Sequence, residues 1–318
     1  MPEDVTPEDN CSMPSVLRIT SLGRAALFPR GYRMDATLFH ARASMAVTWT
    51  VNQPDTRLKS GSLVSPRYLG CSNCQDGVVT IARVVLLERS IRAEDMFMTV
   101  PGDWVADRDL LDRASTLWRH LPLAWQELMN GVLWQGDRFR RFCVGPGSVS
   151  GHHSERNGNL RHMVETAETV LALLPKHPAA HPDIALAAAL LHDMAKADDY
   201  RPTQAGWVLT DHGRLIGHKS TIGDWIAVAK SRMKLTLPAA QYASLRHALG
   251  AAKGVLFESG YRTPMTPEAR LLSLADQSSG AGNLYARQSA ANGGWGVPHR
   301  HLGNQAPFTV VRNPAPLH

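Results

Sequence analysis

The sequence predicts a multidomain α+β protein in which a small β barrel precedes an all-helical domain. Short segments rich in β-branched residues, separated by Gly, Pro, Asn and Asp, run through residues 15–92, and this pattern is typical of strands joined by turns. From about residue 106, apolar residues recur at helical spacing. Because 318 residues with 44% hydrophobic content can bury more than one core, we expect two domains.

The strand-forming region divides into four apolar segments, at residues 16–20, 34–51, 62–70 and 77–88. On periodicity alone they predict a small barrel or sandwich. Their order, with a long strand pair first and a turn at Asp76-Gly77 before the last strand, resembles the OB-fold. The resemblance implies that residues 15–100 form an OB-like β domain, a kind of barrel that commonly binds single-stranded nucleic acid.

Helical patterns fill most of the remaining chain. Residues 101–147 are predicted to form a helical connector that ends near Gly145-Pro146-Gly147. Residues 148–282 are predicted to form a separate domain whose helices are divided by Pro and Gly clusters. We expect a flexible N-terminus at residues 1–14. The abundance of Gly, Asn, Ala and Pro after Gly280 predicts an extended C-terminal tail at residues 283–318.

Charge and composition narrow the class of partner. The chain has 34 Lys and Arg against 28 Asp and Glu, a net charge of +6, which favours an anionic partner such as nucleic acid. The first residues lack the basic start and apolar run of a secretory leader, and no stretch reaches roughly 18 uninterrupted apolar residues. Four Cys are too few for a disulfide scaffold. We therefore expect a cytoplasmic protein with no membrane contact, and we predict no particular oligomeric state.

Histidine and aspartate residues recur in and beside the predicted helices. His192-Asp193 follows the apolar run IALAAALL, and His162 lies in the preceding amphipathic helix. An imidazole beside a carboxylate suits a divalent cation. The same region supplies three further candidate ligands, His218, His247 and Asp276. The series is large enough for two adjacent metals, which can stabilise both the attacking and the leaving oxygen of a phosphoryl displacement.

The segments that contain these residues, among them GHHSERNGNLRHM, LLHDMAKADD and PEARLLSLADQ, resemble HD-domain phosphohydrolases. Within that superfamily they resemble the YhaM-type 3′-to-5′ exoribonucleases, which carry an OB-fold, a helical connector and an HD domain. The resemblance implies a metal-dependent phosphodiesterase that shortens single-stranded RNA from its 3′ end and releases nucleoside monophosphates, with single-stranded DNA as the alternative substrate. It also implies one or two divalent ions, with Mn²⁺ expected first and Mg²⁺, Co²⁺, Fe²⁺, Ni²⁺ or Zn²⁺ as alternatives.

The resemblance also implies roles for individual residues. His162, His192, Asp193 and Asp276 would be the core metal ligands. His218 and His247 would complete a second metal position, and together with Asp193 they would take part in catalysis. Lys196 would stabilise charge that develops on the scissile phosphate. The paired residues His152 and His153 match histidines that open the first HD helix in the family, and we expect them to contact the substrate.

The predicted barrel offers a substrate-binding surface of its own. The aromatic residues Tyr32, Phe39, Trp49 and Tyr68 interleave with basic residues, and such a mixture can stack on bases while it contacts phosphates. The alternative is that these aromatics fill the barrel core. From this region we select Tyr32, Arg33 and Arg67 as candidate strand contacts.

Three other functions remain open. An HD nucleotidase or cyclic-nucleotide phosphohydrolase would use the same ligands but would need no strand-binding domain. A conjugation-associated DNA-processing protein of the HD-relaxase type shares some of these motifs. A nucleic-acid-binding protein without activity is the third, because Arg161, Ala195 and Arg246 differ from the residues usual in the family.

Overall fold

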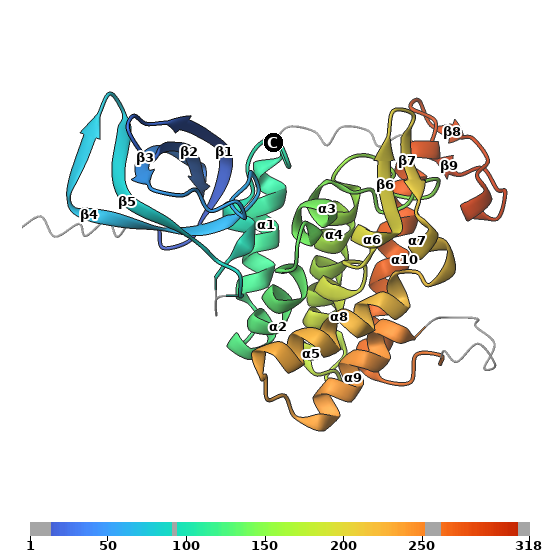
Figure 1. Ribbon diagram of the computed structural model, residues 1–318. Helices are drawn as coiled ribbons and strands as arrows, with labels where there is room; N and C mark the ends of the chain where they lie inside the picture. The colour runs from blue at the N-terminus through green and yellow to red at the C-terminus, as the bar shows by residue number, and fades with distance from the viewer. Residues whose placement is uncertain (1–13, 91–93, 252–261, 311–318) are drawn as a thin grey trace, which may run out of the picture. The chain divides into compact units, whose positions relative to one another are not determined.

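The computed structural model describes residues 14–90, 94–251 and 262–310, which form two compact units. One unit contains residues 14–88 and 98–101, and the other contains the remaining described residues. The predicted order, a small β barrel followed by a helical domain, is confirmed (Figure 1). The predicted flexible segment at residues 1–14 lies outside the described residues except for Pro14.

The first unit is a closed barrel of five strands (Figure 1). The strands are β1 (Leu17–Ala26), β2 (Tyr32–His40), β3 (Ala43–Val51), β4 (Leu63–Gln75) and β5 (Val78–Leu86). Their order around the barrel is β1-β2-β3-β5-β4, and β1 pairs with β4 to close it. The β3–β5 pair is parallel and the other pairs are antiparallel.

Alternation of apolar residues along the strands fills the barrel interior. On β2, Met34, Ala36 and Leu38 are buried, and Met34 lies opposite Trp49 of β3 while Ala36 lies opposite Val47. Burying such a side chain contributes about 1.5–3 kcal/mol to folding for the larger residues. The segment 34–51 therefore forms the strand pair that its pattern predicts.

A buried arginine joins β1 to the residues that follow the barrel strands. Arg18 is only 3% exposed. Its Nε donates to the Thr99 carbonyl oxygen at 3.0 Å, and its Nη2 donates to Thr99 Oγ1 at 2.7 Å. Its Nη1 donates to the Gly61 carbonyl oxygen at 2.7 Å. A buried charge of this kind is tolerated because each side of the guanidinium finds an acceptor.

The second unit is mainly helical. Its helices are α1 (Arg108–Arg119), α2 (Leu123–Leu133), α3 (Arg138–Val144), α4 (Gly158–Leu173), α5 (Pro182–Leu191), α6 (Lys196–Asp199), α7 (Asp211–Leu215), α8 (His218–Met233), α9 (Ala239–Gly250) and α10 (Pro267–Gln288). Short 3₁₀ helices lie at Met96–Thr99, Leu174–Lys176 and Arg300–Leu302. Within the described ranges, no helix has both the length and the apolar composition needed to cross a membrane.

Three helices, α4, α5 and α10, pack against one another and form the centre of this unit. The apolar helix α5 is buried along most of its length from Ile184 to Leu191. Helices α1 and α3, from the segment predicted as a connector, pack on α4 within the same unit.

Two small hairpins were not anticipated in the helical domain. Strands β6 (Tyr200–Thr203) and β7 (Gly206–Leu209) form one, and β8 (Gly294–Trp295) and β9 (Phe308–Thr309) form the other. Helix α10 also continues to Gln288, so an extended chain from residue 283 is not what the structure shows. Burial of Gly280 and Leu284 provides tertiary contacts that offset the weak helix propensity of glycine.

We expect Arg18→Met to destabilise the barrel by about 3 kcal/mol, because the substitution leaves buried acceptors on Thr99 and Gly61 without a donor. Hydrogen–deuterium exchange of the full-length protein should show amides of β1 exchanging roughly 100-fold faster. Arg30→Met is the control, since Arg30 is exposed. Equal exchange in the two variants would show that the Arg18 contacts do not hold the barrel together.

Candidate metal centre

The turn after α5 presents His192 and Asp193 at the centre of the helical unit. The sequence pattern continues beyond Leu191, but the helix ends there and residues 192–195 form a turn. Asn159 holds this turn through its Nδ2, which donates to the Asp193 carbonyl oxygen at 3.1 Å. His192 and Asp193 are 6% and 5% exposed. Both side chains are thereby fixed in the interior, at the end of an apolar helix.

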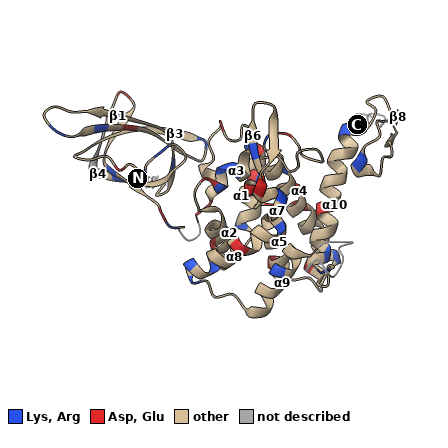
Figure 2. Cartoon of the chain, turned by 45° about the vertical axis from the view of Figure 1, so that its right-hand side comes forward, with Lys and Arg blue, Asp and Glu red and all other residues tan. Residues whose placement is uncertain are grey.

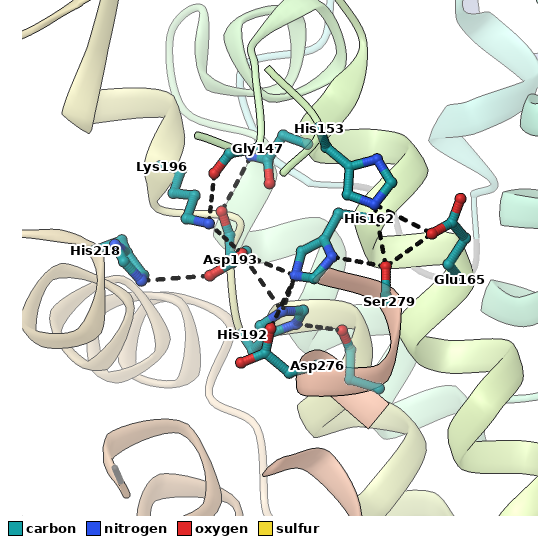
Figure 3. Close-up of polar contacts among 12 residues, drawn as sticks. Gly147, His153, His162, Glu165, His192, Asp193, Lys196, His218, Asp276 and Ser279 are labelled. Atoms are coloured by element: carbon teal, nitrogen blue, oxygen red, sulfur yellow. Dashed lines mark hydrogen bonds and ion pairs between the residues drawn. The ribbon is translucent and has the colours of Figure 1, made fainter. Parts of the chain in front are cut away.

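Four side chains converge on one point beside this turn (Figure 3). His162 Nε2, from α4, lies 3.2 Å from His192 Nε2 and 3.4 Å from Asp193 Oδ2. On the α10 side, Asp276 Oδ1 lies 3.1 Å from the same His162 nitrogen. The structure therefore brings together the four residues that the sequence assigned as core metal ligands.

The outer nitrogens of the two central rings determine which nitrogen faces this point. His192 Nδ1 lies 2.8 Å from the Ala189 carbonyl oxygen, which can only accept, so Nδ1 carries the proton. His162 Nδ1 lies 3.0 Å from Ser279 Oγ, and that hydroxyl donates to Glu165 Oε2 at 2.7 Å. Since the Ser279 proton is used in this bond, His162 Nδ1 donates to Ser279. Both Nε2 atoms therefore point a lone pair at the centre.

This arrangement fits a bound divalent cation. Two Nε2 lone pairs only 3.2 Å apart repel each other unless a positive charge lies between them. The spacing agrees with two nitrogens on one metal, roughly 3.0–3.4 Å for metal–nitrogen bonds of about 2.1 Å. Burial lowers the pKa of His192, which keeps this ring neutral and able to act as a ligand. Mixed imidazole and carboxylate donors suit first-row divalent metals.

Lys196 holds the central carboxylate in its charged form. Its Nζ lies 2.5 Å from Asp193 Oδ2 and donates to the Gly147 carbonyl oxygen at 2.6 Å. Burial alone would raise the pKa of Asp193, but Lys196 and the nearby imidazoles hold it well below its usual range. The ammonium is only 9% exposed and both contacts are to protein. Lys196 thus positions Asp193, a contact that the resemblance did not imply.

His218 faces the other oxygen of the same carboxylate. Its Nε2 lies 3.3 Å from Asp193 Oδ1, and its Nδ1 lies 2.9 Å from Asp199 Oδ2. Because Nδ1 is bonded to Asp199, Nε2 is the ring nitrogen that faces Asp193. Asp193 consequently has imidazole nitrogens beside both of its oxygens.

His152 lies beside the centre on the side of α10. Its ring centroid is 4.9 Å from that of His162, and a ligand atom of His152 groups with those of His162 and Asp276. Its buried Nε2 has no hydrogen-bond partner among the described residues. Burial lowers the pKa of His152 to about 4, so the ring is neutral at pH 7. His152 is therefore available as a metal ligand or as a contact to substrate.

Its neighbour His153 has a different place from the one expected. The ring is 1% exposed, and its Nε2 lies 3.2 Å from Ser279 Oγ and 3.1 Å from Glu165 Oε2. It supports the Glu165–Ser279 pair behind His162, so it is not exposed to a substrate as the resemblance had implied. Glu165 and Ser279 were not identified from the sequence, although each follows a ligand, His162 or Asp276, by three residues on the same helical face.

His247 is not part of the centre, and the prediction that it completes a second metal position is corrected. Its Nε2 accepts a hydrogen bond from the Met265 backbone N–H at 2.9 Å. It lines a separate cavity of about 430 Å³ between α8 and α9. Two arginines that differ from the family pattern make their contacts elsewhere. Arg161 pairs with Asp107 at 3.0 Å, and Arg246 donates to Tyr242 Oη at 3.3 Å.

The predicted aromatic surface of the barrel is not formed. Phe39 and Trp49 are buried, and Tyr32 and Tyr68 pack against the barrel core. Trp49 belongs to the apolar interior, on which the half-buried Tyr32 and Tyr68 pack, whereas Phe39 is buried on the opposite face of β2 from Leu38. Of the selected cations, Arg33 pairs with Asp35 at 3.1 Å. Arg67 is exposed on the outside of β4.

The helical fold and the converging histidine and aspartate side chains agree with an HD-type domain, and a domain of this type implies a metal-dependent phosphohydrolase. Residues 159–281 match the family model for the HD domain, and this segment contains all four converging ligands and His218. The match supports the assignment of this part of the chain to the HD-domain superfamily. No curated protein matches the chain in sequence.

Two glycines of α10 provide a matched test of the place of His152. An added Cβ at Gly280 would lie 3.0 Å from His152 Nδ1, whereas one at Gly282 would meet nothing within 4 Å. Gly282→Ala should raise the free energy of unfolding by about 0.5–1 kcal/mol through helix propensity. Gly280→Ala should not show this increase in the free energy of unfolding, because His152 must move to make room for the new Cβ. The same movement should weaken Mn²⁺ binding.

Thermal unfolding and calorimetric titration with Mn²⁺ measure the two effects. If both variants were equally stabilised and bound Mn²⁺ as the wild type does, His152 would not lie against α10 at the centre.

Proposed function

We propose that the protein is a metal-dependent 3′-to-5′ exonuclease that acts on single-stranded RNA, with single-stranded DNA as the alternative substrate. The observation that carries the proposal is the pair of facing imidazole nitrogens, 3.2 Å apart, between two carboxylates in an HD-type domain. We propose Mn²⁺ as the metal. The cytoplasm is the compartment we expect for such an enzyme.

The barrel supports a strand as the substrate. Its strand order and its closure by β1 and β4 are those expected of an OB-like barrel, a fold that commonly holds single-stranded nucleic acid. Lys and Arg outnumber Asp and Glu in residues 14–88, and Figure 2 shows basic segments on several barrel strands. An enzyme for free nucleotides has no need of such a unit in the same chain.

The residues of the centre would share the chemistry as follows. His162, His192, Asp193 and Asp276 would hold the cation, which when bound supplies Lewis acidity and promotes ionisation of water near neutral pH. Lys196 keeps Asp193 charged and fixed. The side chains of Asp276 and His218 are 43% and 26% exposed, unlike the buried His162. The phosphodiester would therefore approach on the side of Asp276 and His218, where His218 Nε2 can contact a phosphate oxygen or a second ion.

A time course with 5′-labelled single-stranded RNA and its DNA counterpart tests the proposal. With Mn²⁺ we expect a ladder that shortens from the 3′ end, because the centre would remove terminal nucleotides one by one. EDTA should abolish it. His192→Ala and Asp193→Asn should reduce the rate at least about 100-fold, the upper range for loss of a supporting group at a metal site.

His247→Ala is the matched control, since this histidine lies outside the centre and should leave the rate unchanged. Cleavage of mononucleotides or cyclic nucleotides without cleavage of either strand would favour a nucleotidase. A strict preference for DNA would favour a DNA-processing role. No cleavage of any substrate with any of the metals would overturn the proposal.

A further inference from the structure

Two arginines lie directly opposite each other on the outside of the barrel. Arg67 of β4 pairs in register with Arg83 of β5, and both are exposed. In an antiparallel pair, side chains of residues in register project from the same face, with Cβ atoms about 4.5–5.5 Å apart. The two guanidinium groups therefore extend into solvent from neighbouring points of one surface.

A bulge in β5 produces this arrangement. Ile81 lies opposite Tyr68, but Arg83 rather than Ala82 lies opposite Arg67, so one residue of β5 has no partner. Ile81 and Val84 both belong to the apolar interior. Strict alternation from Ile81 would turn residue 83 inward, and the extra residue turns it outward instead. Bulges commonly re-aim a side chain in this way.

The pair is electrostatically unfavourable as it stands. Like charges directly opposite each other on a sheet are destabilising. Two other barrel arginines have acidic partners: Arg33 pairs with Asp35, and Arg57 pairs with Asp55 at 2.7 Å. Within the described residues, neither Arg67 nor Arg83 has a carboxylate at ion-pair distance. A bound anion would remove the repulsion and bond to both guanidinium groups.

We propose that Arg67 and Arg83 together bind a backbone phosphate of the single-stranded substrate. The inference rests on the proposed function, because a phosphodiester centre in the same chain makes a nucleic acid the anion of choice. Two guanidinium groups offer planar sets of N–H donors that match phosphate oxygens. The contact is to the backbone, so it holds the strand without regard to base sequence.

Fluorescence anisotropy with a labelled single-stranded RNA, in EDTA to prevent cleavage, tests the inference on the full-length protein. Arg67→Gln and Arg83→Gln should each weaken binding by about 5- to 10-fold. Each should also lower the slope of log affinity against log salt by up to about 0.7, the value for one phosphate on a single strand. Neither variant should lower the melting temperature, because each removes a repulsion.

Arg57→Gln is the matched control, since it changes the net charge equally at an arginine that already has carboxylate partners. Affinity and salt slope unchanged from the wild type in both variants of the pair would overturn the inference. So would a protein that binds vesicles containing phosphatidylserine but no oligonucleotide.

The two proposals can fail separately. If the wild type and both variants digest RNA and bind it with equal affinity, the arginine pair has no role in binding and the exonuclease proposal remains. If binding depends on the pair but Mn²⁺ supports no cleavage, the strand contact stands and the exonuclease proposal fails.

Discussion

The helical unit is arranged around two imidazole nitrogens that face each other, Nε2 of His162 and Nε2 of His192, 3.2 Å apart. Each ring bonds through its other nitrogen to a neighbouring group, so both Nε2 atoms are placed to hold a cation, which would make the contact favourable. The carboxylates of Asp193 and Asp276 bring negative charge to the same point. Helix α4, the turn after α5 and helix α10 each contribute side chains to this point. The packing of these three elements therefore fixes the positions of the donor atoms.

A second group of side chains keeps the donors in this orientation. Burial by itself disfavours the charged form of Glu165, but hydrogen bonds from His153 and Ser279 outweigh it and lower the pKa. The ionised Glu165 accepts from Ser279, which fixes His162, while Lys196 fixes Asp193. Supporting groups of this kind set the tautomer and orientation of metal ligands. They explain why a buried charge cluster can be stable: each charged group has a specific partner.

Arginine has two opposite roles in the barrel. Arg18 is buried, and acceptors on Gly61 and Thr99 satisfy its guanidinium, so its role is in the fold. Arg67 and Arg83 are exposed and in register, and neither has an acidic partner in the part of the chain that the structure describes. An arginine surrounded by acceptors of the protein thus stabilises the fold, whereas an exposed arginine without such acceptors can bind an external anion.

Much of the architecture and of the centre could be predicted from the sequence. Period-two and helical patterns placed the strands and the main helices, because side-chain burial imposes those periods. The order His162, His192-Asp193, Asp276 and its resemblance to the HD family selected four residues that the structure brings together. The sequence left the aromatic residues of the barrel open between the core and a binding surface, since their spacing is the same for an inward face and an outward one.

The sequence by itself determined the order of the two units, the periodic cores and the four residues that converge at the centre. Only the tertiary structure decided that His247 turns to Met265 while His152 lies beside the centre, that Lys196 binds Asp193, and that a bulge sets Arg83 beside Arg67. The reason is physical. Periodicity reports which face of an element is buried, whereas distances between side chains on different elements depend on how helices pack and strands register.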